Sequence, residues 1–228
     1  MIPHTSAMAS LNRIFPPQVV HALLRRALLL AALSLAPAAA MAARTVMVFG
    51  DSLAAAYNLS PAEGWVHLIE ERISGARLAW RVVNASISGE TTAGGLRRLS
   101  EDLKRHKPSV VVIELGGNDA LRGQPVAEMQ SNLEKMVRLV RGARAEPVLV
   151  GIMIPPNYGI EYAAQFHGMY GQIAARDKLV LVPYLLEGLV DKPEFFQNDR
   201  IHPTAGAQVL IADTVWGVLE PVLRKKGP

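Results

Sequence analysis

Residues 45–53 read Thr-Val-Met-Val-Phe-Gly-Asp-Ser-Leu, and this stretch decides the fold class. The apolar run at positions 46–50 stops at a small polar group, and an alanine-rich segment follows. Such a run is typical of a buried parallel strand that ends in a sharp turn. In open α/β folds this turn lies at the carboxyl edge of the sheet, where ligands bind. The alanines behind it favour a helix that begins directly after the turn.

Ser52 is a candidate nucleophile, because the predicted turn places it at the carboxyl edge of the sheet and at the amino end of the next helix. A second interpretation is that Asp51 or Ser52 only caps this helix. The tripeptide Gly-Asp-Ser fits both interpretations. The choice between them therefore depends on whether the rest of the chain supplies catalytic partners.

The composition is that of a globular protein, with 50% hydrophobic and 19% charged residues in 228 positions. This length predicts one domain with a substantial core. The chain contains no cysteine. Disulfides, thiolate zinc sites and a cysteine nucleophile are therefore excluded.

Residues 1–42 have the pattern of a secretory signal peptide. They carry three arginines and no acidic residue, then an apolar run at 27–36 and the small-residue site Ala40-Met41-Ala42. We expect cleavage after Ala42, with Ala40 as the second choice, and a catalytic domain at 43–228. The protein would then be periplasmic or secreted. A membrane anchor is the alternative, but the run is short for a span of about 20 residues.

The charge of the processed chain predicts no nucleic-acid partner. The full chain has 24 basic and 20 acidic residues, and loss of the three amino-terminal arginines leaves 21 and 20. No basic cluster of the kind that follows a phosphate backbone remains. We expect Arg97-Arg98 and Arg224-Lys225-Lys226 to be solvated helix surface.

Strand and helix patterns alternate along the rest of the chain. Further strands are predicted at 78–85, 109–115, 147–154 and 178–182, and helices at 61–73, 93–106, 126–143, 162–176 and 203–223, with 183–200 irregular. The run at 109–115 is the most continuous β-branched segment and should be the central strand. Five strands joined by helical crossovers predict an α/β fold, with a parallel sheet covered on both faces.

Three of the predicted strands end in polar loops. These are Gly50-Asp51-Ser52-Leu53, Ser88-Gly89-Glu90 and Gly116-Gly117-Asn118-Asp119. The carboxyl ends of parallel strands meet at one edge, so the three loops should lie together. A fourth segment, Asp199-Arg200-Ile201-His202-Pro203, precedes the last helix. There Asp199 can reach His202 and fix its tautomer, which completes the parts that a serine hydrolase needs.

These four segments resemble the sequence blocks of the SGNH (GDSL) hydrolase family. They are GDSL at 50–53, glycine at 89, GxND at 116–119 and DxxHP at 199–203, in the family's order and spacing. The resemblance covers the whole processed chain. It is strongest to bacterial periplasmic enzymes with thioesterase, lysophospholipase and arylesterase activity. It implies a flavodoxin-like three-layer α/β/α sandwich with a five-stranded parallel sheet.

The resemblance also implies a role for each site residue. Ser52 would be the nucleophile, His202 the base and Asp199 the orienting acid. The amides of Ser52 and Gly89 and the side chain of Asn118 would form the oxyanion hole. The expected activity is hydrolysis of aryl esters, acyl thioesters and lysophospholipids, with no cofactor and no metal ion.

Other residues are expected to have supporting roles. Asp51 and Asp119 should each brace their own loop, and His67, His106 and His167 should be surface or packing residues. Leu121, Met153 and Ile154 are expected to line an apolar slot for the acyl chain, with the loop at 120–125 closing over it.

Several alternatives use the same kind of sheet. Flavin-binding and receiver modules do so, but the phosphate and dinucleotide glycine motifs are absent from the sequence. A metal hydrolase would need more ligands than Asp199 and His202. An exported glycan O-acetyl deacetylase with the same site stays open as the alternative function. The sequence assigns neither the natural acyl chain nor the oligomeric state.

Overall fold

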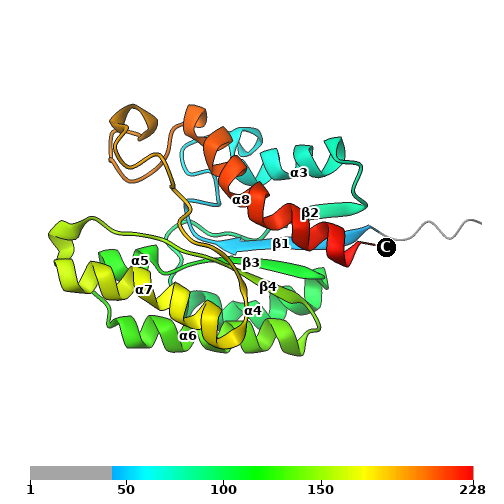
Figure 1. Ribbon diagram of the computed structural model, residues 1–228, viewed down its shortest axis with the longest axis horizontal. Helices are drawn as coiled ribbons and strands as arrows, with labels where there is room; N and C mark the ends of the chain where they lie inside the picture. The colour runs from blue at the N-terminus through cyan, green and yellow to red at the C-terminus, as the bar shows by residue number, and fades with distance from the viewer. Residues whose placement is uncertain (1–42, 228) are drawn as a thin grey trace, which may run out of the picture. The chain divides into compact units, whose positions relative to one another are not determined.

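The computed structural model describes residues 43–227, in which strands and helices alternate (Figure 1). The strands are β1 (Arg44–Gly50), β2 (Trp80–Asn84), β3 (Val110–Glu114), β4 (Glu146–Val150) and β5 (Val180–Val182). All are parallel, in the order β2-β1-β3-β4-β5. The predicted five-stranded parallel sheet is confirmed, and β3 is its central strand.

The predicted signal peptide lies outside the described residues. Cleavage after Ala42, the boundary of the catalytic domain at 43 and the periplasmic or secreted localisation stay predictions.

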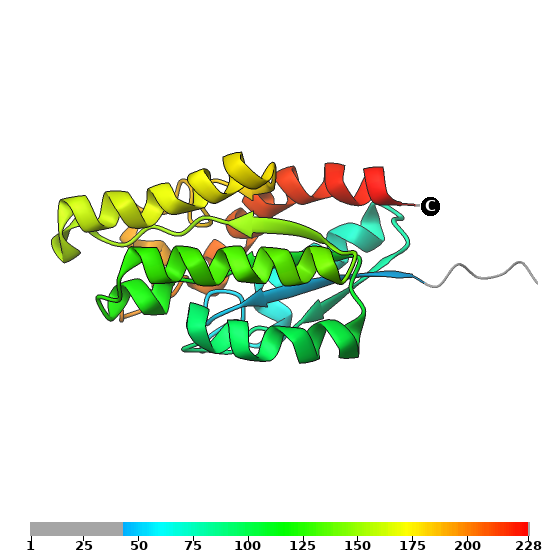
Figure 2. The ribbon, with the colours of Figure 1, turned by 90° about the horizontal axis from the view of Figure 1, so that it is seen from below.

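Helices cover both faces of the sheet, which gives three layers (Figures 1 and 2). One face carries α3 (Trp65–Gly75) and α8 (Ala205–Lys226), and the other carries α4 (Thr92–His106), α6 (Val126–Gly142) and α7 (Ile160–Asp177). The short helix α5 (Gly117–Leu121) and 3-10 turns at Pro61–Glu63, Pro156–Tyr158 and Pro193–Phe195 complete the described elements.

The alternation of side chains along β1 separates two hydrophobic cores. Val46 and Val48 point to the face of α3 and α8, whereas Met47 and Phe49 point to the face of α4, α6 and α7. All four are fully buried. Because both faces of β1 are buried, every side chain of the strand interior meets an apolar core. Positions 46–50 therefore form a continuous apolar run with no polar residue.

Helix α8 is, within residues 43–227, the one helix long and apolar enough to cross a membrane by length and composition. Its apolar residues face the sheet and α3, and seven of them are buried: Ala207, Ile211, Ala212, Val215, Leu219, Val222 and Leu223. Burial of this face accounts for the composition, so α8 is a core helix.

The segment at 52–59 forms successive turns, and the prediction of a helix there is wrong. Two carbonyls that a helix would use are bonded elsewhere. The Leu53 carbonyl accepts from Trp65 Nε1 at 2.9 Å, and the Ala54 carbonyl accepts from Asn84 Nδ2 at 2.8 Å. These tertiary hydrogen bonds override the helix propensity of the alanines.

Two other element boundaries differ from the prediction. Strand β4 ends at Val150 and not at 154, because the chain turns away at Gly151, where an added Cβ would lie 2.1 Å from the Pro183 carbonyl oxygen. Helix α5 begins at Gly117 in what was expected to be a loop, after Gly116 with a φ of 124°.

Candidate active site

Ser52, His202 and Asp199 form one chain of hydrogen bonds at the carboxyl edge of the sheet. Ser52 Oγ lies 2.8 Å from His202 Nε2, and His202 Nδ1 lies 2.7 Å from Asp199 Oδ2. The serine comes from the turn after β1, and the other two come from the loop before α8. The structure therefore brings Ser52 into contact with His202, which lies 150 positions further along the sequence.

Asp199 is held by the turn in which it lies. Its Oδ1 accepts from the amides of Ile201 at 2.9 Å and His202 at 3.0 Å, which leaves Oδ2 for the imidazole. Burial alone would raise the pKa of Asp199. The hydrogen bonds from the backbone and side chain of His202 and from the Ile201 amide outweigh it and lower the pKa to about 2. Asp199 is therefore a carboxylate at any ordinary pH, and His202 Nδ1 is its hydrogen-bond donor.

Tyr57 contacts His202 and was not found by sequence reasoning. Its ring centroid lies 4.2 Å from that of the imidazole. Gln197 Nε2 donates to the carbonyls of Tyr57 and Pro203, each at 3.0 Å, and so ties the serine loop to the histidine loop. The prediction of a helix after Ser52 hid this contact, because such a helix would have carried Tyr57 elsewhere.

Asp51 connects the turn of Ser52 to helix α5. Its Oδ1 accepts from the Leu53 amide at 3.0 Å, and its Oδ2 accepts from Asn118 Nδ2 at 3.0 Å. Burial raises the pKa of Asp51 to about 6, although both hydrogen bonds and His202 oppose the rise. Asp51 braces its own loop, as expected, and in addition orients the Asn118 amide.

Glu114 is a second buried acid that sequence reasoning missed. Its Oε2 accepts from the Asp51 amide at 3.1 Å, and its Oε1 has no partner among residues 43–227. Burial, together with the charge of Asp51, holds the pKa of Glu114 well above its usual range. The signal was the single acid within the β-branched run at 109–115.

Gly50 makes room for this carboxyl group. A Cβ on Gly50 would lie 2.4 Å from Glu114 Oε2 and 2.9 Å from the Glu114 carbonyl oxygen. The glycine before the nucleophile turn therefore allows a close approach between the ends of β1 and β3.

The predicted oxyanion donors come from two loops, after β1 and after β2, and from the short helix α5. In the described part of the chain, neither the Ser52 amide nor the Gly89 amide donates a hydrogen bond. Gly89 has a φ of 79°, a conformation that favours glycine. Asn118 lies in α5, where Asp51 uses one of its two amide hydrogens. All three groups therefore keep a hydrogen available for a ligand.

Two expectations beside these loops are wrong. Asp119 does not brace its own loop through its side chain, because its carboxylate accepts from the Thr92 amide at 2.8 Å and from Thr92 Oγ1 at 2.6 Å, which joins α5 to the start of α4. Arg98 is not solvated, because its side chain is only 21% exposed and is bonded on several sides. Both side chains bond to residues outside their own helix.

Of the three residues expected to line an acyl slot, one is buried in the core. Met153 is 45% exposed, and Leu121 is half-buried. Ile154 is buried in the same core as Ile152 and therefore does not line an open slot.

His67 and His106, which are predicted to be surface or packing residues, lie beside acidic residues of their own helices. His67 is on the surface of α3 beside Glu70 and Glu71, and His106 lies beside Asp102. Within residues 43–227, no group of three His, Asp or Glu side chains could hold a metal ion.

Comparison with known proteins agrees with this fold. The model of the GDSL-like lipase/acylhydrolase family matches residues 48–209. The chain is 47% identical over 182 residues to esterase TesA of Pseudomonas aeruginosa, and the match covers 80% of this chain and 90% of that protein. It is 39% identical over 188 residues to thioesterase 1/protease 1/lysophospholipase L1 of Escherichia coli, covering 81% and 87%. A crystal structure of TesA superposes with a TM-score of 0.76 at 46% identity, covering 78% of this chain and 99% of that one.

The chain belongs to the GDSL-like lipase/acylhydrolase family. It is an enzyme that hydrolyses ester bonds, with the single-domain α/β fold of this family.

Proposed function

We propose that the protein is a serine esterase that hydrolyses carboxylic esters and thioesters through an acyl-enzyme on Ser52. The observation that carries this proposal is the continuous hydrogen-bonded chain from Ser52 Oγ through His202 to Asp199. The thioesterase and lysophospholipase names of a relative support the substrate classes of acyl thioesters and lysophospholipids.

In the first half of the reaction, Ser52 Oγ attacks the acyl carbonyl while His202 Nε2 takes its proton. The 2.8 Å contact between them is within the range for direct proton transfer. Asp199 stabilises the imidazolium that forms and keeps Nε2 free for Ser52. His202 then gives the proton to the leaving alcohol or thiol, and the acyl-enzyme remains.

In the second half, water attacks the acyl carbonyl of the acyl-enzyme, and His202 Nε2 accepts its proton. The bond to Ser52 Oγ then breaks, His202 returns the proton to this oxygen, and the carboxylic acid leaves. Both tetrahedral intermediates carry a negative oxygen. The amides of Ser52 and Gly89 and the side chain of Asn118 donate to this oxygen, which explains why these groups have hydrogens free. No step of this mechanism needs a cofactor.

The test of the nucleophile is the Ser52→Ala variant. We expect a loss of roughly 10⁶-fold in kcat with little change in thermal stability, because this side chain is at the surface of a turn and contributes little packing. A fluorophosphonate should label Ser52 and no other serine. Labelling elsewhere, or full turnover by the variant, would refute the assignment.

The proposal includes export, with processing after Ala42 or Ala40. Its support is the basic, apolar and small-residue order of residues 1–42. Terminal sequencing of protein from the cell envelope should find Ala43 or a nearby residue first. Recovery of an intact Met1 from that fraction would refute it.

A further inference from the structure

The loop at 85–90 carries Gly89 and joins β2 to α4. One side of this loop is bonded to the end of β1. Gly50 donates to Ser86 Oγ at 3.1 Å, and the Ile87 amide donates to the Gly50 carbonyl at 3.0 Å. These bonds fix the first half of the loop to the strand that precedes Ser52. Gly89 itself receives only a long contact, 3.4 Å from the exposed Arg122 to its carbonyl.

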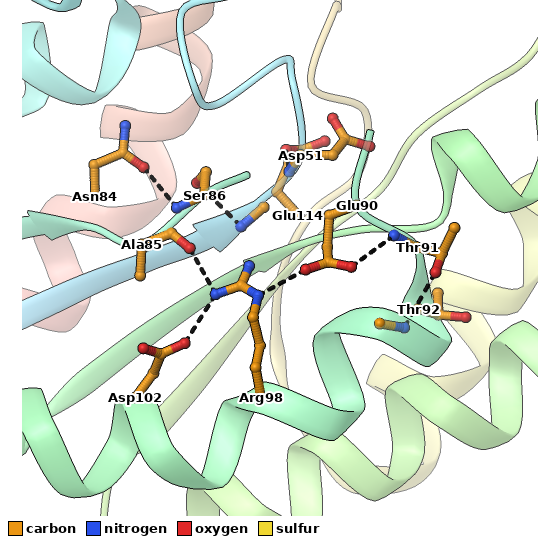
Figure 3. Close-up of polar contacts among 12 residues, drawn as sticks. Asp51, Asn84, Ala85, Ser86, Glu90, Thr91, Thr92, Arg98, Asp102 and Glu114 are labelled. Carbon is orange, nitrogen blue, oxygen red and sulfur yellow. Dashed lines mark hydrogen bonds and ion pairs between the residues drawn. The ribbon is translucent and has the colours of Figure 1, made fainter. Parts of the chain in front are cut away.

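Arg98 of α4 holds the loop at its two ends (Figure 3). Its Nη1 donates to the Ala85 carbonyl at 2.8 Å, and its Nε donates to Glu90 Oε2 at 2.7 Å. Glu90 follows Gly89 directly, and its Oε1 accepts from the Thr91 amide at 3.1 Å. Arg98 therefore bridges the first and last residues of the segment that presents the Gly89 amide.

The guanidinium is itself held firmly. It lies 3.9 Å from the centre of the Phe49 ring, and Asp102 accepts from Nη1 at 2.8 Å on the side away from the loop. The side chains of Arg98 and Glu90 are 21% and 12% exposed. Ion pairs so shielded from water, with additional hydrogen bonds, fix geometry more strongly than surface pairs do.

Two glycines in the first turns of α4 make space for this arrangement. A Cβ on Gly94 would lie 1.9 Å from Glu90 Oε1, and a Cβ on Gly95 would lie 2.6 Å from Leu115 Cδ1 and 3.1 Å from the Phe49 ring. Each glycine inside a helix costs about 1 kcal/mol relative to alanine. The helix therefore gives up intrinsic stability at one position beside the Glu90 carboxylate and at one beside the Phe49 ring on which Arg98 lies.

We infer that Arg98 and Glu90 are positioning residues that hold the Gly89 amide toward the oxyanion. Neither residue touches the reacting atoms. Their effect reaches the reaction through the backbone of Gly89. Within residues 43–227, the one hydrogen bond of Gly89 itself is the 3.4 Å contact from Arg122 to its carbonyl. This inference rests on the proposed role of Gly89 as an oxyanion donor. A displacement of about 1 Å at such a group can cost up to roughly 10² in rate.

The test compares Arg98→Met with Arg97→Met. Arg97 is the adjacent residue of α4 and is exposed, so the two variants lose the same charge from the same helix. We expect Arg98→Met to lower kcat on p-nitrophenyl butyrate by about 10- to 100-fold, with KM within twofold. Arg97→Met should retain wild-type kcat. Arg98→Lys should be intermediate, because an ammonium group cannot reproduce the fork that bridges Ala85 and Glu90.

A second measurement separates positioning from general loss of structure. An alkylboronic acid forms a tetrahedral adduct with a reactive serine, and one adduct oxygen occupies the oxyanion site. The affinity for this inhibitor should fall in Arg98→Met by the same factor as kcat/KM, whereas the affinity for the free carboxylic acid product should not change. Glu90→Gln keeps the shape of the side chain and one acceptor oxygen. It should therefore lower the affinity for the boronic acid by a smaller factor than Arg98→Met does.

Wild-type kcat in Arg98→Met, a change in KM alone, or an equal loss in Arg97→Met would each overturn the inference. If Arg98→Met does not fold, Arg98→Lys and Glu90→Gln replace it in the comparison with Arg97→Met. Wild-type kcat in both of these variants would then overturn the inference. The proposed function fails separately, if Ser52→Ala retains turnover. If Ser52→Ala loses activity and the Arg98 variants keep wild-type activity, only the positioning role is rejected.

Discussion

Asp51 Oδ2 accepts a hydrogen bond from Asn118 Nδ2 at 3.0 Å, so the residue before the candidate nucleophile orients the amide proposed to stabilise the oxyanion. The same carboxylate accepts from the Leu53 amide through Oδ1. One side chain therefore fixes the turn of Ser52 and the direction of Asn118 together. This arrangement makes the site pre-organised, because the donor does not have to move as charge develops.

Asn118→Ala should lower kcat by roughly 10² to 10³, which is about 2.7 to 4 kcal/mol of transition-state stabilisation. The physical reason is the loss of one donor to the developing oxyanion. Steady-state kinetics on a p-nitrophenyl ester measures it. Asn132→Ala is the control, since Asn132 bonds Thr92 in the same region and has no donor near Ser52. A change confined to KM would contradict the role.

Asp199→Asn should be more damaging than Asp199→Ala. Oδ1 of Asp199 is occupied by two backbone amides, so an asparagine would keep its oxygen there and turn its NH₂ toward His202 Nδ1. The imidazole would then carry its proton on Nε2 and could not accept from Ser52. A loss of roughly 10⁴ in kcat is expected for asparagine. Equal kcat values for the two variants would contradict this argument.

Glu114→Gln should stabilise the protein at alkaline pH but not at pH 4. The pKa of Glu114 in the fold lies well above that of the unfolded chain, so its contribution to stability is complete below about pH 4.5. That contribution is lost as pH rises toward the folded pKa. The difference in Tm between variant and wild type should therefore grow from pH 4 to pH 8, and Glu101→Gln on the exposed face of α4 should show no such trend. A constant difference would mean that Glu114 is ionised in the fold.

Gly50→Ala should destabilise the protein by about 1 to 3 kcal/mol, because the new methyl group would overlap Glu114 and touch Ala54. Gly217→Ala in α8 is the matched control. A Cβ there meets nothing within 4 Å, so this variant should gain up to about 1 kcal/mol of helix propensity. Chemical denaturation measures both changes. Similar stabilities for the two variants would show that the Gly50 site can relax.

The five-stranded parallel sheet and the loops at its carboxyl edge were predictable, because each strand and each loop depends on a local signal. An apolar run that ends in Gly-Asp-Ser predicts a strand and its edge wherever the rest of the chain lies. Arg98 gave no such signal. It stands beside Arg97 in the sequence, and only the packing of α4 on the sheet decides which arginine meets Phe49 and Glu90.

Tyr57 and the turns around it could not be predicted for a related reason. The alanines after Ser52 favour a helix, but Trp65 and Asn84 take two of the carbonyls that the helix needs. These donors come from the next helix and the next strand. Tertiary hydrogen bonds therefore determine the backbone beside the nucleophile, and local propensity does not.

The loops at the carboxyl edge carry the apolar surface that an acyl chain would contact. Exposed apolar side chains stand on the segments that follow β1, β2 and β4 and on the one that precedes α8: Tyr57, Ile87, Met153 and Ile201. Each methylene buried there contributes about 0.8 kcal/mol, or about fourfold in kcat/KM. We therefore expect kcat/KM for p-nitrophenyl esters to rise from acetate to octanoate.

Met153→Ser should make kcat/KM rise less steeply with chain length and should leave kcat/KM for the acetate unchanged. Only the longer acyl chains extend far enough from the carbonyl carbon to contact the Met153 side chain. Leu139→Ser is the control, since Leu139 is exposed on α6 and is not part of the edge loops. A series of kcat/KM values over acetate, butyrate, hexanoate, octanoate and decanoate for the three proteins tests both statements. A flat or falling series in the wild type would remove the acyl surface and favour the glycan O-acetyl deacetylase alternative, since an acetyl group needs no apolar surface beyond its own methyl.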